Sequence, residues 1–174
     1  MTESRGILVR EVELGDARAL NAYVKRVYET SDHLITAPDE YRISTFARWR
    51  WIVRKLSSSG EICFIATDTG GEIIGMIDGW VDPRQRVRHV LTFAMSVRAD
   101  RGRTGIGRKL LATLIDWVKA HPYIRKIELH VHADNAAAEA LYTSFGFILE
   151  GERKGAVRYE DGRVVNDRLM ALWP

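Results

Sequence analysis

Apolar side chains recur along the chain at two spacings, and the change from one spacing to the other separates strands from helices. Short apolar runs predict strands over residues 7–12, 62–67, 73–81, 87–97, 126–131, 147–157 and 164–172. Apolar residues three or four positions apart predict helices over residues 17–29, 44–56, 105–120 and 136–144. Residues 30–42 are polar and contain Pro38, which indicates an irregular connection.

Capping and turn residues support these boundaries. Asp16 is expected to cap the first helix, and Ser44 stands near the start of the second. Hairpin turns are predicted at 68–71 and 160–162, where Asp and Gly fall between apolar runs. In the second helix Trp49 fits the apolar face and is expected in the core. Hairpins mixed with strand-helix-strand crossovers predict an α/β fold with one mixed sheet, helices on both faces and a single domain over 1–174.

The amino-acid composition excludes several classes of protein. The 174 residues are 46% hydrophobic and 28% charged, which excludes a disordered chain, a collagen-like repeat and a disulfide scaffold. The one cysteine, Cys63, lies in an apolar run and is expected to be buried, and no metal site is expected. No run approaches the roughly 20 apolar residues of a membrane span, so we expect a cytoplasmic protein without a membrane partner.

A glycine- and arginine-rich segment, residues 101–109, lies between a predicted strand and the clearest predicted helix. Glycines permit tight turns, and the first turn of a helix exposes unpaired N–H groups, so this segment suits a pyrophosphate. The net charge of 26 − 23 = +3 also suits an anionic ligand. There is no Gly-Lys-Ser/Thr for a Walker loop. A dinucleotide fingerprint needs a glycine where Leu110 stands, although Glu128 lies near the place of a ribose-binding acid.

Two motifs carry a resemblance to a known family. Met95-Ser96-Val97 followed by Gly105-Ile106-Gly107-Arg108-Lys109-Leu110-Leu111 resembles the acetyl-CoA loop of the GNAT superfamily of N-acetyltransferases. The run from Asn135 to Phe147 is similar to its second motif, Asn-x-x-Ala-x-x-Leu-Tyr-x-x-x-Gly-Phe. The resemblance covers residues 6–173 and implies the GNAT fold, with a mostly antiparallel central sheet and acetyl-CoA as co-substrate. One departure is Gly102, where the family usually has Gln or Arg.

The resemblance also implies roles for individual residues. The strand over 90–97 would carry a bulge and splay from its neighbour, so that backbone groups of Met95 and Val97 pair with the pantetheine arm. Tyr142 would donate a proton to the departing thiolate, which a phenol can do at neutral pH. The cofactor-binding residues implied are Met95, Val97, Arg103, Thr104, Gly105, Ile106, Gly107, Arg108 and Asn135. Asn135 is also a candidate helix cap.

The general base and the acceptor stay open at this point. Candidate bases are Glu29, Asp32, Asp78, Asp82, His89, Glu128 or an ordered water. The runs 147–154 and 167–170 look like the branch of the family that modifies amino acids, ribosomal-protein N-termini or polyamines. Basic residues near the pocket would favour an acceptor with a carboxylate, whereas Glu29 and Asp32 would favour a polyamine. Segments implied to form the acceptor pocket contain Tyr28, Glu29, Asp32, His33, Trp49, Trp51, Arg153, Arg158 and Tyr159.

The main hypothesis is therefore an acetyl-CoA-dependent N-acetyltransferase that acts by direct attack on a primary amine of a small molecule or on a protein N-terminus. The alternative is a non-catalytic acyl-CoA-binding regulatory module. A covalent intermediate on Cys63 is not needed, and no basic strand with interleaved aromatic residues supports a nucleic-acid partner. A homodimer is expected, because exposed C-terminal hairpin strands offer an edge for pairing.

Overall fold

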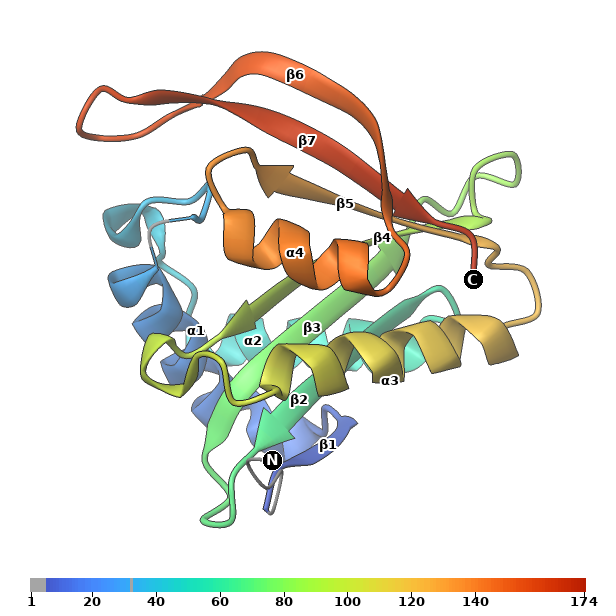
Figure 1. Ribbon diagram of the computed structural model, residues 1–174. Helices are drawn as coiled ribbons and strands as arrows, with labels where there is room; N and C mark the ends of the chain where they lie inside the picture. The colour runs from blue at the N-terminus through green and yellow to red at the C-terminus, as the bar shows by residue number, and fades with distance from the viewer. Residues whose placement is uncertain (1–5, 32) are drawn as a thin grey trace.

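The computed structural model of the chain, which describes residues 6–31 and 33–174, contains one sheet of seven strands in the order β1-β2-β3-β4-β5-β7-β6 (Figure 1). Only β4 and β5 run parallel, and every other neighbouring pair is antiparallel. The predicted mixed, mostly antiparallel sheet is confirmed. The strands are β1 (Leu8–Glu11), β2 (Glu61–Thr67), β3 (Ile73–Val81), β4 (Val90–Val97), β5 (Lys126–His132), β6 (Ile148–Arg158) and β7 (Val164–Leu172).

Helices cover both faces of this sheet, as predicted. They are α1 (Ala17–Thr30), α2 (Thr45–Ser57), α3 (Ile106–Ala120) and α4 (Ala136–Ser144), with short 3-10 helices η1 (Leu14–Asp16), η2 (Pro38–Glu40) and η3 (Ala99–Arg101). Figure 1 shows α3 and α4 in front of the sheet and α1 and α2 behind it. Two hydrophobic cores follow from this layering, one on each face. Among the described residues, no helix combines the length and the apolar character that crossing a bilayer demands.

One predicted strand boundary and one predicted helix cap are wrong for local reasons. The strand predicted from residue 87 begins at Val90, because the amides of Val87 and Arg88 both donate to the Arg84 carbonyl and form a turn instead. Asp16 stands at the N-cap position of α1, but its side chain makes no cap hydrogen bond to that helix. Its carboxylate accepts from the Glu13 amide at 2.7 Å and from Arg10, which closes η1 one turn earlier. The Ser44 hydroxyl accepts from the Ala47 amide at 3.1 Å and caps α2.

The buried face of α2 also differs from the prediction. Trp49 is 41% exposed and stacks on exposed Phe46, so its predicted place in the core is wrong. Instead Arg48, Ile52 and Lys55 face the sheet. Cations occupy this face because partners on neighbouring elements neutralise or bond them; the Lys55 ammonium, for example, lies 2.5 Å from an Asp78 carboxylate oxygen.

The β6–β7 hairpin curves away from the rest of the sheet and reaches over the end of β5 (Figure 1). Its turn is the predicted one at 160–162, with Gly162 at φ +86° and the Arg163 amide bonded to the Asp161 carboxylate. The pairing register of β6 shifts twice, between Leu149 and Gly151 and between Arg153 and Val157. Such irregularities bend a strand, and here they carry β6 side chains toward the end of β5.

Candidate active site

The parallel strands β4 and β5 separate halfway along their length. They pair only from Val90–Lys126 to Thr92–Glu128. Beyond Thr92, β4 stays paired with β3 through Val97. The expected splay is confirmed. The expected bulge is wrong, because the β3–β4 register runs without a shift over the whole of β4. The separation opens a strand edge that an extended ligand can join by backbone hydrogen bonds.

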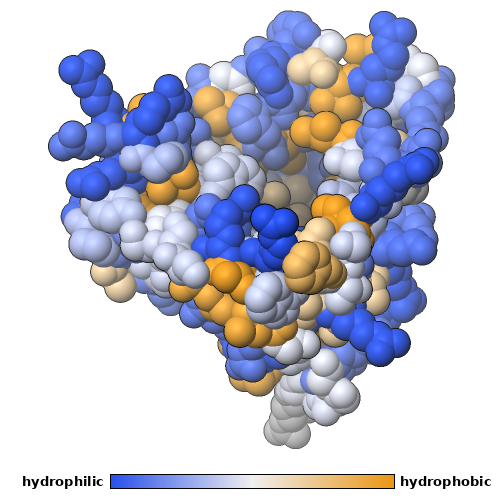
Figure 2. Space-filling model, turned by 180° about the vertical axis from the view of Figure 1, so that it is seen from behind, coloured by the Kyte–Doolittle hydropathy of each residue, from blue (hydrophilic) through white to orange (hydrophobic). Residues whose placement is uncertain are grey.

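A cavity of about 540 Å³ occupies this separation. Its residues come from both faces of the sheet, so the cavity passes between β4 and β5. Met95, Val97, Asn135 and Tyr142, all predicted site residues, line it. The other lining residues are Tyr28, His33, Leu34, Ile35, Thr36, Trp80, Thr92, Phe93, Ala94, Ser96, His130, Val131, His132, Ala138, Leu141, Arg153 and Asp167. On the face that carries α1 and α2, the surface is hollowed between polar and apolar side chains (Figure 2).

The segment between η3 and α3 is a sharp turn that leads directly into the first turn of α3. Arg103 has φ +61° and Gly105 has φ +82°, both in the left-handed region, so the chain turns sharply into α3. The first amides of α3 have no intrahelical acceptor, which leaves them directed out of the helix. A Cβ on Gly107 would lie 3.2 Å from Leu141 and 3.6 Å from Met95. Gly107 therefore permits α3, α4 and β4 to approach closely beside the cavity.

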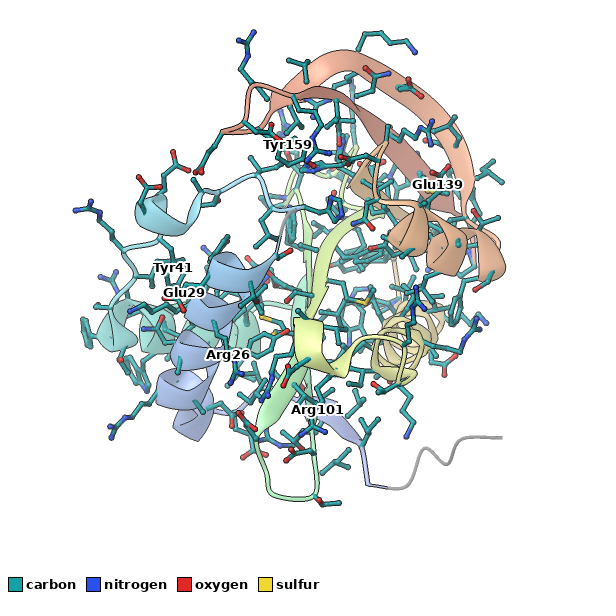
Figure 3. All side chains as sticks on the ribbon, turned by 60° about the vertical axis from the view of Figure 1, so that its left-hand side comes forward. Arg26, Glu29, Tyr41, Arg101, Glu139 and Tyr159 are labelled. Carbon is teal, nitrogen blue, oxygen red and sulfur yellow. The ribbon has the colours of Figure 1, made fainter. Side chains whose placement is uncertain are left out.

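Three of the four basic side chains in this loop already have protein partners. Arg101 lies 3.5 Å from the Asp68 carboxylate, at the lower end of β4 in Figure 3. Arg108 donates to the Ser144 hydroxyl at 3.0 Å, and Lys109 donates to the Ile7 carbonyl at 3.3 Å. Arg103 is exposed. The main anion-binding capacity of this loop therefore lies in the amides at the start of α3, with Arg103 as the most accessible charge.

Tyr142 lies on the α3 and α4 side of the cavity. It is 6% exposed and packs edge-on against Phe93, with ring centroids 5.8 Å apart. Burial raises the pKa of Tyr142 to about 12, so the phenol keeps its proton at neutral pH. Asn135 lines the same side, and its side chain accepts from the Ala138 amide at 3.2 Å, which confirms it as the cap of α4.

Strand register places histidines on the opposite side of the cavity. Leu129 and Val131 pack in the core beneath α3 and α4. Because side chains alternate along a strand, His130 and His132 point to the other face, which carries α1 and α2. β7 pairs Asp167 with His132, so this carboxylate shares their face. None of the three was predicted as a site residue; the available signal was the His-x-His alternation at the end of the strand predicted over 126–131.

His130 and Asp167 form a hydrogen-bonded pair at the cavity wall. The His130 Nδ1 atom lies 2.6 Å from Asp167 Oδ2, and Asp167 is 1% exposed. The same oxygen accepts from Arg153 Nε at 2.8 Å. A carboxylate on Nδ1 holds the proton there and leaves the lone pair on Nε2. His130 lines the cavity, and with the proton on Nδ1 its Nε2 atom would be the acceptor.

Of the side chains that were predicted from the sequence as candidate bases, those that the structure describes lie away from the cavity. Glu29 is exposed near Lys25, Asp78 pairs with Lys55 beneath α2, and Asp82 pairs with exposed Arg84. Burial raises the pKa of Asp78 despite that pairing. Glu128 pairs with Lys126 at 3.3 Å. Within the part of the chain that the structure describes, neither these four nor His89 lines the cavity, and Asp32 lies outside the described residues.

The expected acceptor segments contribute unevenly. Tyr28, His33 and Arg153 line the cavity, whereas Trp51 packs against the Arg48 and Lys55 cations. Cys63 is fully buried beneath α1 and α2, and that burial raises the pKa of its thiol. The expectation that Cys63 is buried is confirmed. A buried neutral thiol away from the cavity is a poor nucleophile.

The sequence and the fold both match known acetyltransferases. An L-amino acid N-acetyltransferase from Escherichia coli K12 is 31% identical over 102 residues, which is 58% of this chain and 62% of that enzyme. The alanine N-acetyltransferase of ribosomal protein bS18 from the same organism is 41% identical over 82 residues, 47% of this chain and 53% of that enzyme. The chain thus matches less than two thirds of the length of either curated relative.

Solved structures and a family profile complete the comparison. A GNAT-family acetyltransferase from Streptococcus pneumoniae superposes with a TM-score of 0.93 at 28% identity, over 97% of this chain and 99% of that one. A phosphinothricin acetyltransferase from Sinorhizobium meliloti, solved with acetyl-CoA, has a TM-score of 0.84 at 18% identity, over 97% and 88% of the two chains, and shows the shared fold. The profile of the acetyltransferase (GNAT) family matches residues 12–147. This chain belongs to the acetyltransferase (GNAT) family.

Proposed function

We propose that this protein transfers the acetyl group of acetyl-CoA to the primary amine of a small, carboxylate-bearing acceptor such as an amino acid. The observation that carries the proposal is the cavity between β4 and β5, which has Tyr142 on one side of the sheet and His130 on the other. Acetyl-CoA would bind with its diphosphate at the amides of Gly105 to Arg108 and its pantetheine arm along the β4 edge. Asn135, which lines the cavity, would contact that arm.

The reaction needs three proton transfers, because the amine nitrogen loses two protons and the departing thiolate gains one; His130 and Tyr142, on opposite sides of the cavity, handle them. The His130 Nε2 atom takes a proton from the acceptor ammonium, and the free amine attacks the thioester carbon. A backbone amide of β4 stabilises the charge that develops on the thioester oxygen. The carbon–sulfur bond then breaks, and Tyr142 protonates the departing thiolate. The nitrogen loses its second proton as it becomes an amide nitrogen. This proton passes to the Tyr142 phenolate and restores the phenol.

The charges along the cavity favour an acceptor with a carboxylate over a polyamine. Among the described lining residues, the one carboxylate is Asp167, which is buried and already bonded to His130 and Arg153. A second ammonium group would therefore lack a counter-ion there. Arg153 holds Asp167 through Nε and Nη2, and we assign its Nη1 atom to the acceptor carboxylate.

A paired set of acceptors tests this assignment. Release of the CoA thiol is measured with L-amino acids, with the matching amino-acid amides, and with polyamines. We expect turnover with the amino acids, a KM at least about tenfold higher for the amides, and little turnover with polyamines. Replacing Arg153 with Gln should remove the difference between acid and amide. Equal kinetics for both forms in the wild-type protein would reject the carboxylate assignment.

The same panel separates an enzyme from a binding module. Turnover of peptides that begin with a free amine, without turnover of amino acids, would move the acceptor class to a protein N-terminus. Tight binding of acetyl-CoA without thiol release for any amine would support the non-catalytic alternative.

A further inference from the structure

Four side chains from separate segments converge at the acceptor end of the cavity. His33 follows α1, His132 ends β5, Asp134 lies in the turn after β5, and Tyr159 directly follows β6 in the β6–β7 hairpin. Figure 3 shows the labelled Tyr159 beneath the hairpin, close to the segment that follows α1. One ligand atom from each of His33, His132 and Asp134 lies within 4.8 Å of the others. The Tyr159 hydroxyl lies among them.

Three separations among these atoms are close to the edge length of a tetrahedral metal site. Ligands at about 2.0–2.1 Å from a tetrahedral Zn²⁺ are separated from each other by about 3.3 Å. The His33 Nδ1 atom lies 3.5 Å from Asp134 Oδ1 and 3.4 Å from the Tyr159 oxygen. The Tyr159 oxygen lies 3.3 Å from Asp134 Oδ1 and 2.7 Å from His132 Nδ1. Of these four separations, only the last must lengthen to admit an ion.

The surroundings orient two of these ligands. His132 is 5% exposed, so its ring is held in place by the packing around β5. Arg163 donates to Asp134 Oδ2, which turns the other oxygen, Oδ1, toward the histidines. Its guanidinium lies over the Tyr159 ring, 4.3 Å from the centroid. Supporting hydrogen bonds of this kind commonly fix the orientation of metal ligands.

We propose that His33, His132 and Asp134 bind a divalent transition-metal ion, best matched by Zn²⁺, with the Tyr159 oxygen as a fourth ligand. Two imidazoles and two oxygens form a donor set that suits this class of ion. The sequence predicted no metal because it contains a single cysteine, and these ligands come together only through the fold. A bound ion would tie the segment after α1, the end of β5 and the β6–β7 hairpin together at the mouth of the acceptor cavity.

Titration of the full-length, chelator-treated protein tests the site without reference to acetyl transfer. Calorimetry with CoCl₂ and the visible absorption of Co²⁺ report binding and coordination geometry, and ZnCl₂ is then added as a competitor. We expect one Co²⁺ per chain with an intense tetrahedral absorption that Zn²⁺ abolishes. Zn²⁺ should also raise the midpoint of thermal unfolding, because it binds the folded state.

Variants separate this site from other histidines. His33→Gln replaces a partly exposed ligand outside the sheet and should weaken Co²⁺ binding by at least about tenfold and remove the tetrahedral absorption. His132→Gln provides a second test, and His89→Gln is the matched control that should bind like the wild type. Absence of binding to the wild-type protein would overturn the proposal. Binding that survives His33→Gln, or that His89→Gln weakens equally, would overturn it too.

Discussion

The two sides of the central cavity are built in different ways. The side where we propose that acetyl-CoA binds draws its lining residues from two continuous stretches, β4 up to Val97 and the run from Asn135 to Tyr142. The side proposed for the acceptor collects single residues from α1 and the segment after it, from β3 and β5, and from the β6–β7 hairpin. A continuous stretch that binds a ligand through backbone groups can be read from one sequence motif. A wall made of side chains from several segments changes its binding properties when a single residue is substituted. We infer that the acceptor side sets substrate choice on a shared cofactor site.

The largest effect is expected on the acceptor side. Replacing His130 with Ala removes the proposed base, and kcat should fall by about 10²–10⁴-fold while the Kd for acetyl-CoA stays unchanged. Added imidazole should restore part of the activity, a result that a purely structural role would not give. His89→Ala is the control. Unchanged turnover in the His130 variant would show that the base lies elsewhere.

Removing the Tyr142 hydroxyl tests the opposite side with little change in packing. Tyr142→Phe should lower kcat by about 10²-fold, because the departing thiolate then lacks its proton donor. The aromatic ring against Phe93 is kept, so acetyl-CoA affinity should change little. The rate is measured under saturating substrates. A variant as fast as the wild type would reduce Tyr142 to a packing residue.

A matched pair of glycine substitutions tests whether the segment over residues 101–109 binds acetyl-CoA. Gly105 has φ +82° with open space around it, so Gly105→Ala adds backbone strain alone. A strain of about 1–2 kcal/mol should weaken acetyl-CoA binding by about tenfold or somewhat more. Gly102 has φ −59°, which any residue adopts, and Gly102→Ala should bind normally. Equal affinities for both variants, measured by calorimetry, would contradict a loop that binds through its main-chain geometry.

The smallest effect concerns the hairpin that supports the acceptor wall. Hydrogen bonds from Lys154, Arg168 and Asn166 lower the pKa of Glu152 to about 2. A lowered carboxyl pKa contributes stability that is present above the unfolded value of about 4.3 and is lost as the pH falls toward 2. Thermal midpoints of the wild type should therefore fall over this range more steeply than those of Glu152→Gln. Parallel curves would show that this cluster contributes no pH-dependent stability.

The difference between the two sides of the cavity also explains which site residues could be predicted from the sequence. Met95, Val97, Asn135 and Tyr142 were predicted from their motifs, and all four line the cavity. His130 and Asp167 were missed, because their meeting depends on the register between β5 and β7, which no local signal shows. The roles of all these residues in binding and catalysis stay proposals.

Trp49 illustrates the same limit in the fold. Its helix appeared to have an apolar face, yet α2 buries Arg48 and Lys55 instead. Asp78 on β3 and Glu61 on β2 stabilise Lys55 from distant positions, and helical periodicity carries no information about such partners. The expected homodimer and the cytoplasmic location stay predictions.

The central claim is that acetyl-CoA and the amine occupy the cavity together and react directly. Initial rates measured over a grid of acetyl-CoA and L-amino acid concentrations test it most directly. The account predicts intersecting double-reciprocal lines, which indicate a complex of the protein with both substrates. Parallel lines, with acetyl transfer to the protein before the amine binds, would contradict it.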